Sequence, residues 1–222
     1  MVPLLVEFRQ RQRKNEKKCQ SVCTSESKRV VCGMESMLEL RDSNALDSIK
    51  KATKTASNIN GIHHHEQGFA ALHWDNGKNY IILYSQQLEF VKLIGEFFRK
   101  TDKYSQLSCS YKHIVALDPD KKMLYVYTTK GEFLFTTTLQ RTNRPWGVQC
   151  LNDDTVLVSD FVSGSLRKYE LVEGKSEPVW TCLDLMSPTG ITTSSSGLIF
   201  VASFSGKKIY VISTDGRQHH YL

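Results

Sequence analysis

A short pattern that recurs after 43 residues constrains the fold of this chain more than any other feature. Residues 145–148 (PWGV) and 188–191 (PTGI) are each followed by a polar turn and an apolar strand. A loop that opens with Phe, a second alternating strand and a turn glycine (Gly174 or Gly216) complete each unit. Because self-similarity at a fixed period is typical of repeat architectures, we expect this order of elements to build the whole domain.

Weaker copies of the unit lie upstream. Their strand pairs are expected at 114–118 and 123–127, 80–85 and 88–93, and 29–33 and 37–40. In four units, the first core residue of the second strand precedes the turn glycine by seven or eight residues: Leu88 to Gly95, Leu124 to Gly131, Leu166 to Gly174 and Ile209 to Gly216. This regular spacing indicates a common unit.

Short alternating strands joined by polar turns indicate antiparallel sheets. A repeat near 40 residues with about four strands is typical of a β-propeller blade, which buries both of its faces against neighbouring blades. The sequence therefore predicts an all-β fold, a β-propeller over residues 29–222 with about five visible blades. Both ends stop within a unit, so we expect an incomplete six-bladed ring; a β-sandwich with accidental spacing is the alternative.

The formal net charge of +6 is concentrated at the N-terminus. Residues 1–30 hold eight Lys/Arg and three Glu, whereas the remainder holds 21 basic and 20 acidic residues. We therefore interpret residues 1–28 as a basic leader or linker, helical or disordered, before a near-neutral propeller. Apolar runs reach only about five residues, far short of a membrane-spanning helix, so no membrane partner is expected.

Cysteines and histidines give no prediction of a metal or cofactor. Without an export signal, the six cysteines are expected to be reduced thiols in the cytoplasm. Cys109, Cys150 and Cys182 lie in alternating apolar segments and are interpreted as small core residues. Consecutive histidines at 63–65 are not expected to bind one metal ion, because neighbours on a strand point to opposite faces. They lie in a polar segment between Asn60-Gly61 and Glu66 and are interpreted as a solvated loop.

The motif Pro-x-Gly-Ile/Val, followed by a polar turn, an apolar strand ending in Asp or Ser, a loop and a strand with a glycine turn, resembles the NHL repeat. The resemblance covers residues 29–222 and is sharpest over 111–218. The overall pattern is similar to the C-terminal propeller of tripartite-motif (TRIM-NHL) proteins. Asp160 and Asp118 stand where the repeat has its aspartate, whereas Ser203 and Ser85 depart from it. The resemblance implies a substrate receptor in a TRIM-like ubiquitin pathway. The zinc-ligand spacing of a RING is absent from this sequence, so ligase chemistry is not expected in this chain.

The expected function is a non-catalytic interaction module that binds a protein partner through its inter-strand loops. An RNA-binding propeller is the main alternative, because the resemblance includes family members that bind RNA on one face of the ring. The candidate loop residues are basic or aromatic: Lys121, Lys122, Arg141, Arg144, Phe161, Phe204, Lys207 and Lys208. Trp146 and Trp180 are instead expected in the blade cores.

A calcium-dependent, lactonase-like hydrolase is a less favoured alternative. Asp118, Asp160 and Asn143 could supply the oxygen ligands that calcium needs. An aspartate at a strand end more often caps a turn, so we expect no catalytic residue, cofactor or small-molecule substrate.

Overall fold

The computed structural model describes residues 19–24, 29–34, 37–42, 45–55, 57–75, 78–98 and 106–221, which form strands and turns. No helix capable of crossing a membrane occurs among them. Of the expected leader, Cys19–Thr24 lies within this part and forms strand β1. Because β1 pairs with β2, the first sheet begins ahead of residue 29, where the sequence placed its boundary. Residues 1–18 and 25–28 lie outside the described part.

The strands form five antiparallel sheets, which we call blades 1 to 5. Blade 1 contains β1 (Cys19–Thr24), β2 (Arg29–Met34), β3 (Met37–Asp42) and β4 (Ala45–Lys54). Blade 2 contains β5 (Asn58–His65), β6 (Gly68–Asp75), β7 (Lys78–Ser85) and β8 (Phe90–Phe98). Blade 3 contains β9 (Gln106–Cys109), β10 (His113–Asp118), β11 (Met123–Thr128) and β12 (Phe133–Leu139). Blade 4 contains β13 (Pro145–Cys150), β14 (Thr155–Asp160), β15 (Ser165–Glu170) and β17 (Pro178–Cys182), and blade 5 contains β18 (Pro188–Thr193), β19 (Ile199–Ser203), β20 (Lys208–Ile212) and β21 (Gln218–Tyr221).

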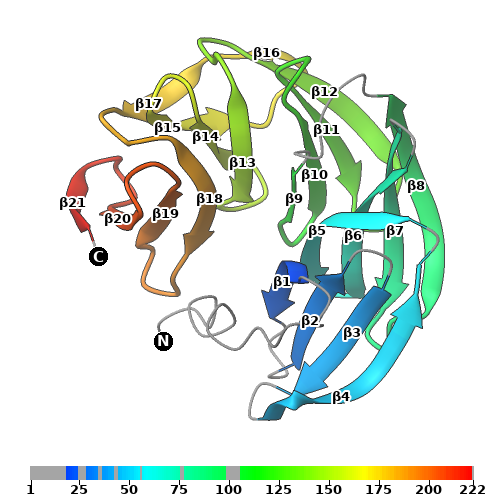
Figure 1. The fold of residues 1–222 in the computed structure, drawn as a ribbon. Helices are drawn as coiled ribbons and strands as arrows, with labels where there is room; N and C mark the ends of the chain where they lie inside the picture. Colours follow the sequence, from blue (N-terminus) through cyan, green and yellow to red (C-terminus); the bar gives the residue numbers. More distant parts are fainter. Residues whose placement is uncertain are drawn as a thin grey trace.

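The blades are arranged around a central axis, with β1, β5, β9, β13 and β18 innermost (Figure 1). This arrangement confirms the predicted all-β propeller with about five blades. Contacts join β1 to β5, β5 to β9, β9 to β13 and β13 to β18. Among the described residues, no contact of that extent joins β18 to β1, so the series of blades is open between its last and first members.

Alternation along each strand explains why the blades stack. In β10, Ile114 and Ala116 pack into the cluster shared with blade 2, whereas Val115 and Leu117 pack into the cluster shared with blade 4. Successive side chains of a strand point to opposite faces, so an unbroken apolar run serves both neighbours. Four such clusters lie between consecutive blades and form the core of the ring.

A close approach between blades 4 and 5 explains the glycine of the PWGV motif. Ser159 Oγ accepts a hydrogen bond from Gly147 N (2.9 Å) and donates one to Thr189 O (2.6 Å). A Cβ added to Gly147 would lie 2.2 Å from Thr189 O, which leaves no room for a side chain. A Cβ at the matching Gly190 in blade 5 would meet nothing within 4 Å, consistent with the open side of that blade.

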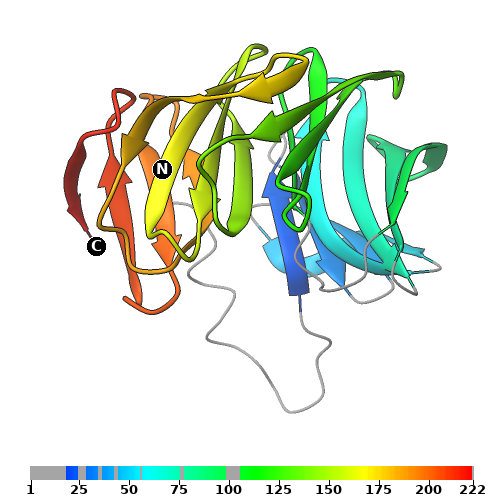
Figure 2. The same cartoon turned by 90° about the horizontal axis from the view of Figure 1, so that it is seen from above.

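The two faces of the ring carry different sets of turns. Because consecutive strands run antiparallel, the turns after the second strand of a blade and the connections between blades emerge on one face. Figure 2 shows the blades side-on, with their strands running between the two faces. The face that carries the turns after the second strands and the connections between blades is called the loop face. It is defined by residues 119–122, 140–144, 161–164, 183–187 and 204–207.

Blade 3 carries an additional strand that the sequence did not indicate. Strand β16 (Gly174–Ser176) leaves blade 4 and pairs parallel with β12, with Leu139 opposite Ser176. Tyr169 Oη also donates a hydrogen bond to Gln140 O at 2.8 Å, so blade 4 is tied to blade 3 at its outer edge.

Candidate functional site

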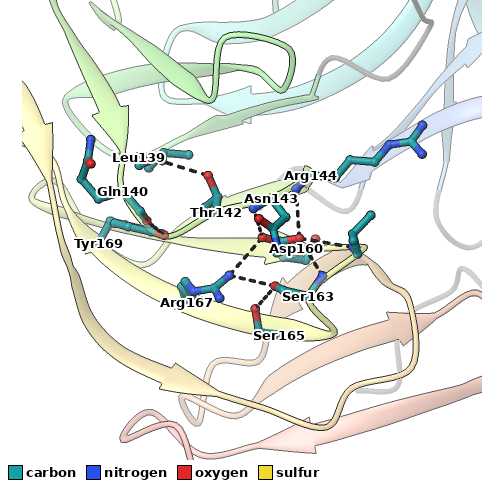
Figure 3. Close-up of polar contacts among 12 residues, drawn as sticks. Leu139, Gln140, Thr142, Asn143, Arg144, Asp160, Ser163, Ser165, Arg167 and Tyr169 are labelled. Carbon is teal, nitrogen blue, oxygen red and sulfur yellow. Dashed lines mark hydrogen bonds and ion pairs between the residues drawn. The ribbon is translucent and has the colours of Figure 1, made fainter.

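A buried carboxylate organises the loop face of blade 4. Asp160, the last residue of β14, is 0% exposed. Its carboxylate oxygens accept hydrogen bonds from the backbone N–H groups of Asn143 (2.5 Å), Arg144 (3.1 Å), Val162 (3.2 Å) and Ser163 (3.1 Å). Asp160 therefore links two segments, the connection that leads from blade 3 into blade 4 and the β14–β15 turn, as Figure 3 shows.

The same carboxylate forms a buried ion pair. Arg167 Nη1 lies 3.1 Å from Asp160 Oδ2 and also donates to Ser163 Oγ at 3.1 Å. Burial raises the pKa of the Asp160 carboxyl, but the backbone hydrogen bonds from Asn143, Ser163 and Arg144 outweigh it, and the net pKa lies below the ordinary value. Both oxygens face N–H donors, an arrangement that stabilises an anion and does not suit a calcium ligand.

Blade 5 builds the same turn with a hydroxyl. Ser203 Oγ accepts a hydrogen bond from Gly206 N (2.9 Å) and donates one to Met186 O (2.5 Å). In blade 3, Asp118 Oδ1 accepts from the N–H groups of Asp120 and Lys121, both at 3.1 Å. The repeat aspartates therefore cap turns, as the sequence predicted, and the structure shows that Ser203 caps the equivalent turn of blade 5.

An aromatic cluster with one guanidinium group lies above this framework. The rings of Trp146 and Phe161 are stacked, with centroids 4.9 Å apart and planes at 28°. Phe204, from the corresponding turn of blade 5, lies 6.3 Å from Phe161 and is 73% exposed. The Arg144 guanidinium lies 5.4 Å from the Trp146 ring and 5.8 Å from the Phe161 ring. We call these four residues the aromatic cluster.

The Arg144 backbone and side chain have different roles. Its N–H is held by Asp160, whereas its side chain extends away from that carboxylate (Figure 3). Within the described residues, no carboxylate forms an ion pair with Arg144. A guanidinium that rests on aromatic rings keeps N–H donors along its edge, and these donors fit a carboxylate or a phosphate.

The structure brings three of the eight predicted loop residues together: Arg144, Phe161 and Phe204. The other candidates lie elsewhere on the loop face or at its rim. Lys121 Nζ contacts Tyr125 Oη (3.0 Å), Arg141 Nε pairs with Glu177 Oε2 (2.9 Å), and Lys208 Nζ lies 4.7 Å from the Tyr210 ring.

Lys122 and Lys207 occupy matching turn positions in blades 3 and 5. Both have a positive φ, 54° and 49° respectively, in the left-handed region that tight turns require. Their backbone conformation therefore serves the turns.

Trp146 is the member of the cluster that sequence reasoning missed. It was expected in the blade core, but it is half-buried and stacks on Phe161. As the second residue of β13 it lies at the loop-face end of an innermost strand. Its position directly after Pro145 and two residues from Arg144 was the available signal. Trp180 does pack against the core between blades 4 and 5, as predicted.

The interpretation of residues 63–65 as a solvated loop was wrong. His63, His64 and His65 end strand β5, paired with Ala70, Phe69 and Gly68 of β6. His65 is only 5% exposed. Burial lowers the pKa of His63, and it lowers the pKa of His65 to about 4, with His64 and His63 adding to the effect.

The predicted core cysteines are confirmed. Cys109, Cys150 and Cys182 are buried in the clusters between blades. Burial raises the pKa of Cys150 to about 12, so this thiol stays protonated and unreactive at neutral pH.

No protein-family model matches the sequence, and no curated protein matches it. Solved structures do match. A protein of unknown function from Bacteroides caccae has a TM-score of 0.72 at 12% identity, with 94% of this chain and 82% of that chain covered. Streptogramin B lyase has a TM-score of 0.70 at 15% identity, covering 93% of this chain and 69% of that chain. The WD40 β-propeller domain of Doa1 has a TM-score of 0.69 at 11% identity, covering 91% and 67%. At these identities the similarity shows the β-propeller fold alone.

Proposed function

We propose that this chain is a non-catalytic β-propeller interaction module whose loop face binds a protein partner. The observation that carries the proposal is the aromatic cluster of Arg144, Trp146, Phe161 and Phe204. Arginine and large aromatic residues dominate binding energy at protein interfaces, and they act best when a rigid scaffold holds them. Here Asp160 fixes the backbone of Arg144 and of the turn that carries Phe161.

The wider assignment rests on the repeat motif. We propose that the propeller is of the NHL type and serves as a substrate receptor in a TRIM-like ubiquitin pathway in the cytoplasm. The positions of the motif in β13, β14, β18 and β19 support this assignment, because Gly147, Asp160 and Ser203 each perform a defined structural task. The similarity to streptogramin B lyase concerns the fold. The buried Asp160 carboxylate faces N–H donors, which speaks against a catalytic or calcium-binding role at that position.

RNA binding is the competing assignment, because stacked rings beside a guanidinium also suit unpaired bases. Several loop-face cations already have partners within the chain, as Lys121 and Arg141 show. These pairings reduce the number of cationic side chains that the loop face can present to a phosphate backbone, so we favour a protein partner.

Replacing Phe204 with Ser should sharply reduce partner binding. The wild-type chain is expected to enrich defined sequences from a random peptide display library, and Phe204→Ser should weaken those peptides at least tenfold, the effect of removing an aromatic hot spot of about 2 kcal/mol. Phe90→Ser is the matched control, because Phe90 is 65% exposed at the outer edge of blade 2.

Three outcomes would contradict the proposal. The first is no enrichment by the wild-type chain, and the second is an equal loss of binding in Phe204→Ser and Phe90→Ser. The third is salt-sensitive retention of a single-stranded RNA pool that Phe204→Ser abolishes, which would assign the face to nucleic acid instead.

A further inference from the structure

Apolar side chains extend the aromatic cluster across the loop face of blades 4 and 5. Val162, Leu183, Met186 and Phe204 are each more than half exposed. Val162 follows Phe161 in the β14–β15 turn, and Leu183 and Met186 lie in the connection from β17 to β18. We call these four residues and Phe161 the apolar patch. Exposed apolar residues that gather on one face indicate an interaction site more often than scattered ones do.

Backbone hydrogen bonds join the loops that carry the patch. Phe161 N donates to Arg144 O at 3.0 Å, and Leu185 N donates to Gly164 O at 2.9 Å. Phe204 N donates to Ser187 O at 3.0 Å. The connections at 140–144 and 183–187 and the turns at 161–164 and 204–207 therefore form one continuous row.

Side-chain hydrogen bonds also hold the row in place. Tyr210 Oη accepts a hydrogen bond from Met186 N at 3.0 Å, and Ser205 Oγ donates to Ser187 Oγ at 2.8 Å. With the hydrogen bond from Ser203 Oγ to Met186 O, these contacts fix the backbone at Met186 and Ser187. A surface ordered before binding loses little conformational entropy on binding, so this patch suits a specific partner.

The charges around the patch favour an acidic partner. Arg144 lies at one end beside Trp146 and Phe161, and Lys207 lies in the same turn as Phe204. The row contains three cations, Arg141, Arg144 and Lys207, and one acidic residue, Asp184. Arg141 is paired with Glu177, so Arg144 and Lys207 leave the row with a positive balance over Asp184. The N-terminal segment of this chain carries a net charge of +5 over residues 1–30, the wrong sign for this surface.

We infer that the apolar patch and Arg144 together bind a protein segment in which a carboxylate side chain is flanked by apolar side chains. The inference rests on the proposed protein-binding function and adds the chemistry of the partner. The carboxylate would pair with the Arg144 guanidinium, which lies over the Trp146 and Phe161 rings. The flanking side chains would cover Val162, Leu183, Met186 and Phe204 and remove them from water.

The test uses the full chain and the peptide most enriched in the display selection described above. We expect this peptide to contain Glu or Asp next to apolar residues. Changing that acid to its amide should weaken binding to the wild-type chain by at least about tenfold, the effect of losing a charged hydrogen-bonded pair. Arg144→Leu should weaken the acidic peptide equally and should bind the acid and amide forms with the same affinity. The measurement is isothermal titration calorimetry of both peptides against each variant.

Two controls keep the result specific. Arg217→Leu makes the same change on the opposite face, where Arg217 is paired with Asp215, and should leave both affinities unchanged. Arg144→Lys keeps the charge but loses the planar fork and should restore part of the preference for the acid.

The possible outcomes separate this inference from the proposed function. Enrichment of peptides without an acidic residue, or equal binding of the acid and amide forms to the wild-type chain, would overturn the inference and leave the interaction module standing. Self-association of the wild-type chain that Phe204→Ser abolishes would also overturn it, by assigning the patch to a second copy. The absence of any enriched peptide would overturn the proposed function itself.

Discussion

Replacing Asp160 with Ala should lower the free energy of unfolding by about 3–5 kcal/mol, because it leaves a buried arginine without its partner. The Arg167 side chain is 9% exposed and pairs with Asp160 Oδ2. The substitution also leaves the N–H groups of Asn143, Arg144 and Ser163 without their acceptor. Equilibrium unfolding in urea measures the change, and the loss of these bonds should also free the loop that carries Arg144.

Asp154→Ala provides the matched control. Asp154 is an exposed residue of the β13–β14 turn on the opposite face, so this substitution should change stability by less than about 0.5 kcal/mol. The loss of stability in Asp160→Asn should lie between those of Asp160→Ala and Asp154→Ala, since the amide keeps one acceptor oxygen but loses the charge. Equal unfolding midpoints for Asp160→Ala and Asp154→Ala would show that the Asp160 network does not stabilise the blade.

Acidification from pH 7 to pH 5 should destabilise the chain by about 2 kcal/mol for each of two buried histidines. Burial lowers the pKa of His65 to about 4 and that of His73 to about 4. His73 is enclosed by blade 2, with Ser57 Oγ 3.2 Å from Nδ1 and Tyr84 Oη 3.1 Å from Nε2.

Acidification lowers the stability because the pKa values of His65 and His73 in the folded chain lie below the unfolded value of about 6.5. Between these values the unfolded chain binds more protons than the folded chain, so stability is complete above about pH 6.5 and is lost as the pH falls towards 4. Urea unfolding at several pH values measures the effect.

His65→Leu should remove the His65 contribution to this pH dependence, about 2 kcal/mol between pH 7 and pH 5. His65 Nε2 is buried with no hydrogen-bond partner among the described residues, so an apolar side chain of similar size should be tolerated at neutral pH. An identical loss of stability on acidification in His65→Leu and in the wild-type chain would show that His65 does not contribute to the pH dependence.

The sequence predicted blades 3 to 5 well because their strands have strong apolar alternation and their turns have regular spacing. The apolar residues of β10, β14 and β19 pack between blades as expected. The turn-capping roles of Asp118 and Asp160 could be anticipated, since a side-chain oxygen at a strand end can accept from the N–H groups of the following turn. Ser203 was interpreted only as a departure from the repeat, although its hydroxyl caps the same turn.

Blade 2 was placed one strand out of phase. Residues 80–85 were expected to be the first strand of the repeat unit, which in blades 3 to 5 is the second strand of the blade. They instead form β7, the third strand of blade 2. The spacing from Leu88 to Gly95 is accidental, because Leu88 lies in the turn before β8 with φ 58° and Gly95 lies within β8. The residue that matches Asp160 is therefore Asp75, at the end of β6, and the comparison with Ser85 was wrong.

The error in blade 2 has a physical cause. Strands β5 and β6 contain polar and small residues, such as the histidines at 63–65 and the buried pair Ala70 and Ala71, which mask the apolar alternation. Pairing between these strands overrides the local polarity. Propensity cannot reveal such tertiary effects, because burial of a histidine depends on what packs over it.

The aromatic cluster could be predicted only in part. Phe161 and Phe204 occupy equivalent positions in the repeat, so their shared face follows from the period of the sequence. The stacking of Trp146 on Phe161, and the row of contacts that adds Leu183 and Met186, depend on how two blades pack and on the path of the β17–β18 connection. Strand β16 was missed for the same reason, since a three-residue parallel pairing leaves no periodic signal.

The central claim is that the loop face of blades 4 and 5 is the binding surface, and backbone amide chemical-shift mapping tests it most directly. Titration of the isotope-labelled chain with the enriched peptide should perturb the amides of the apolar patch and its framework: Arg144, Phe161, Val162, Leu185, Met186 and Phe204. Amides on the opposite face, such as those of Tyr111 and Asp215, should be unaffected. Perturbations confined to the opposite face, or to the outer edge of blade 2 around Phe90, would contradict the account.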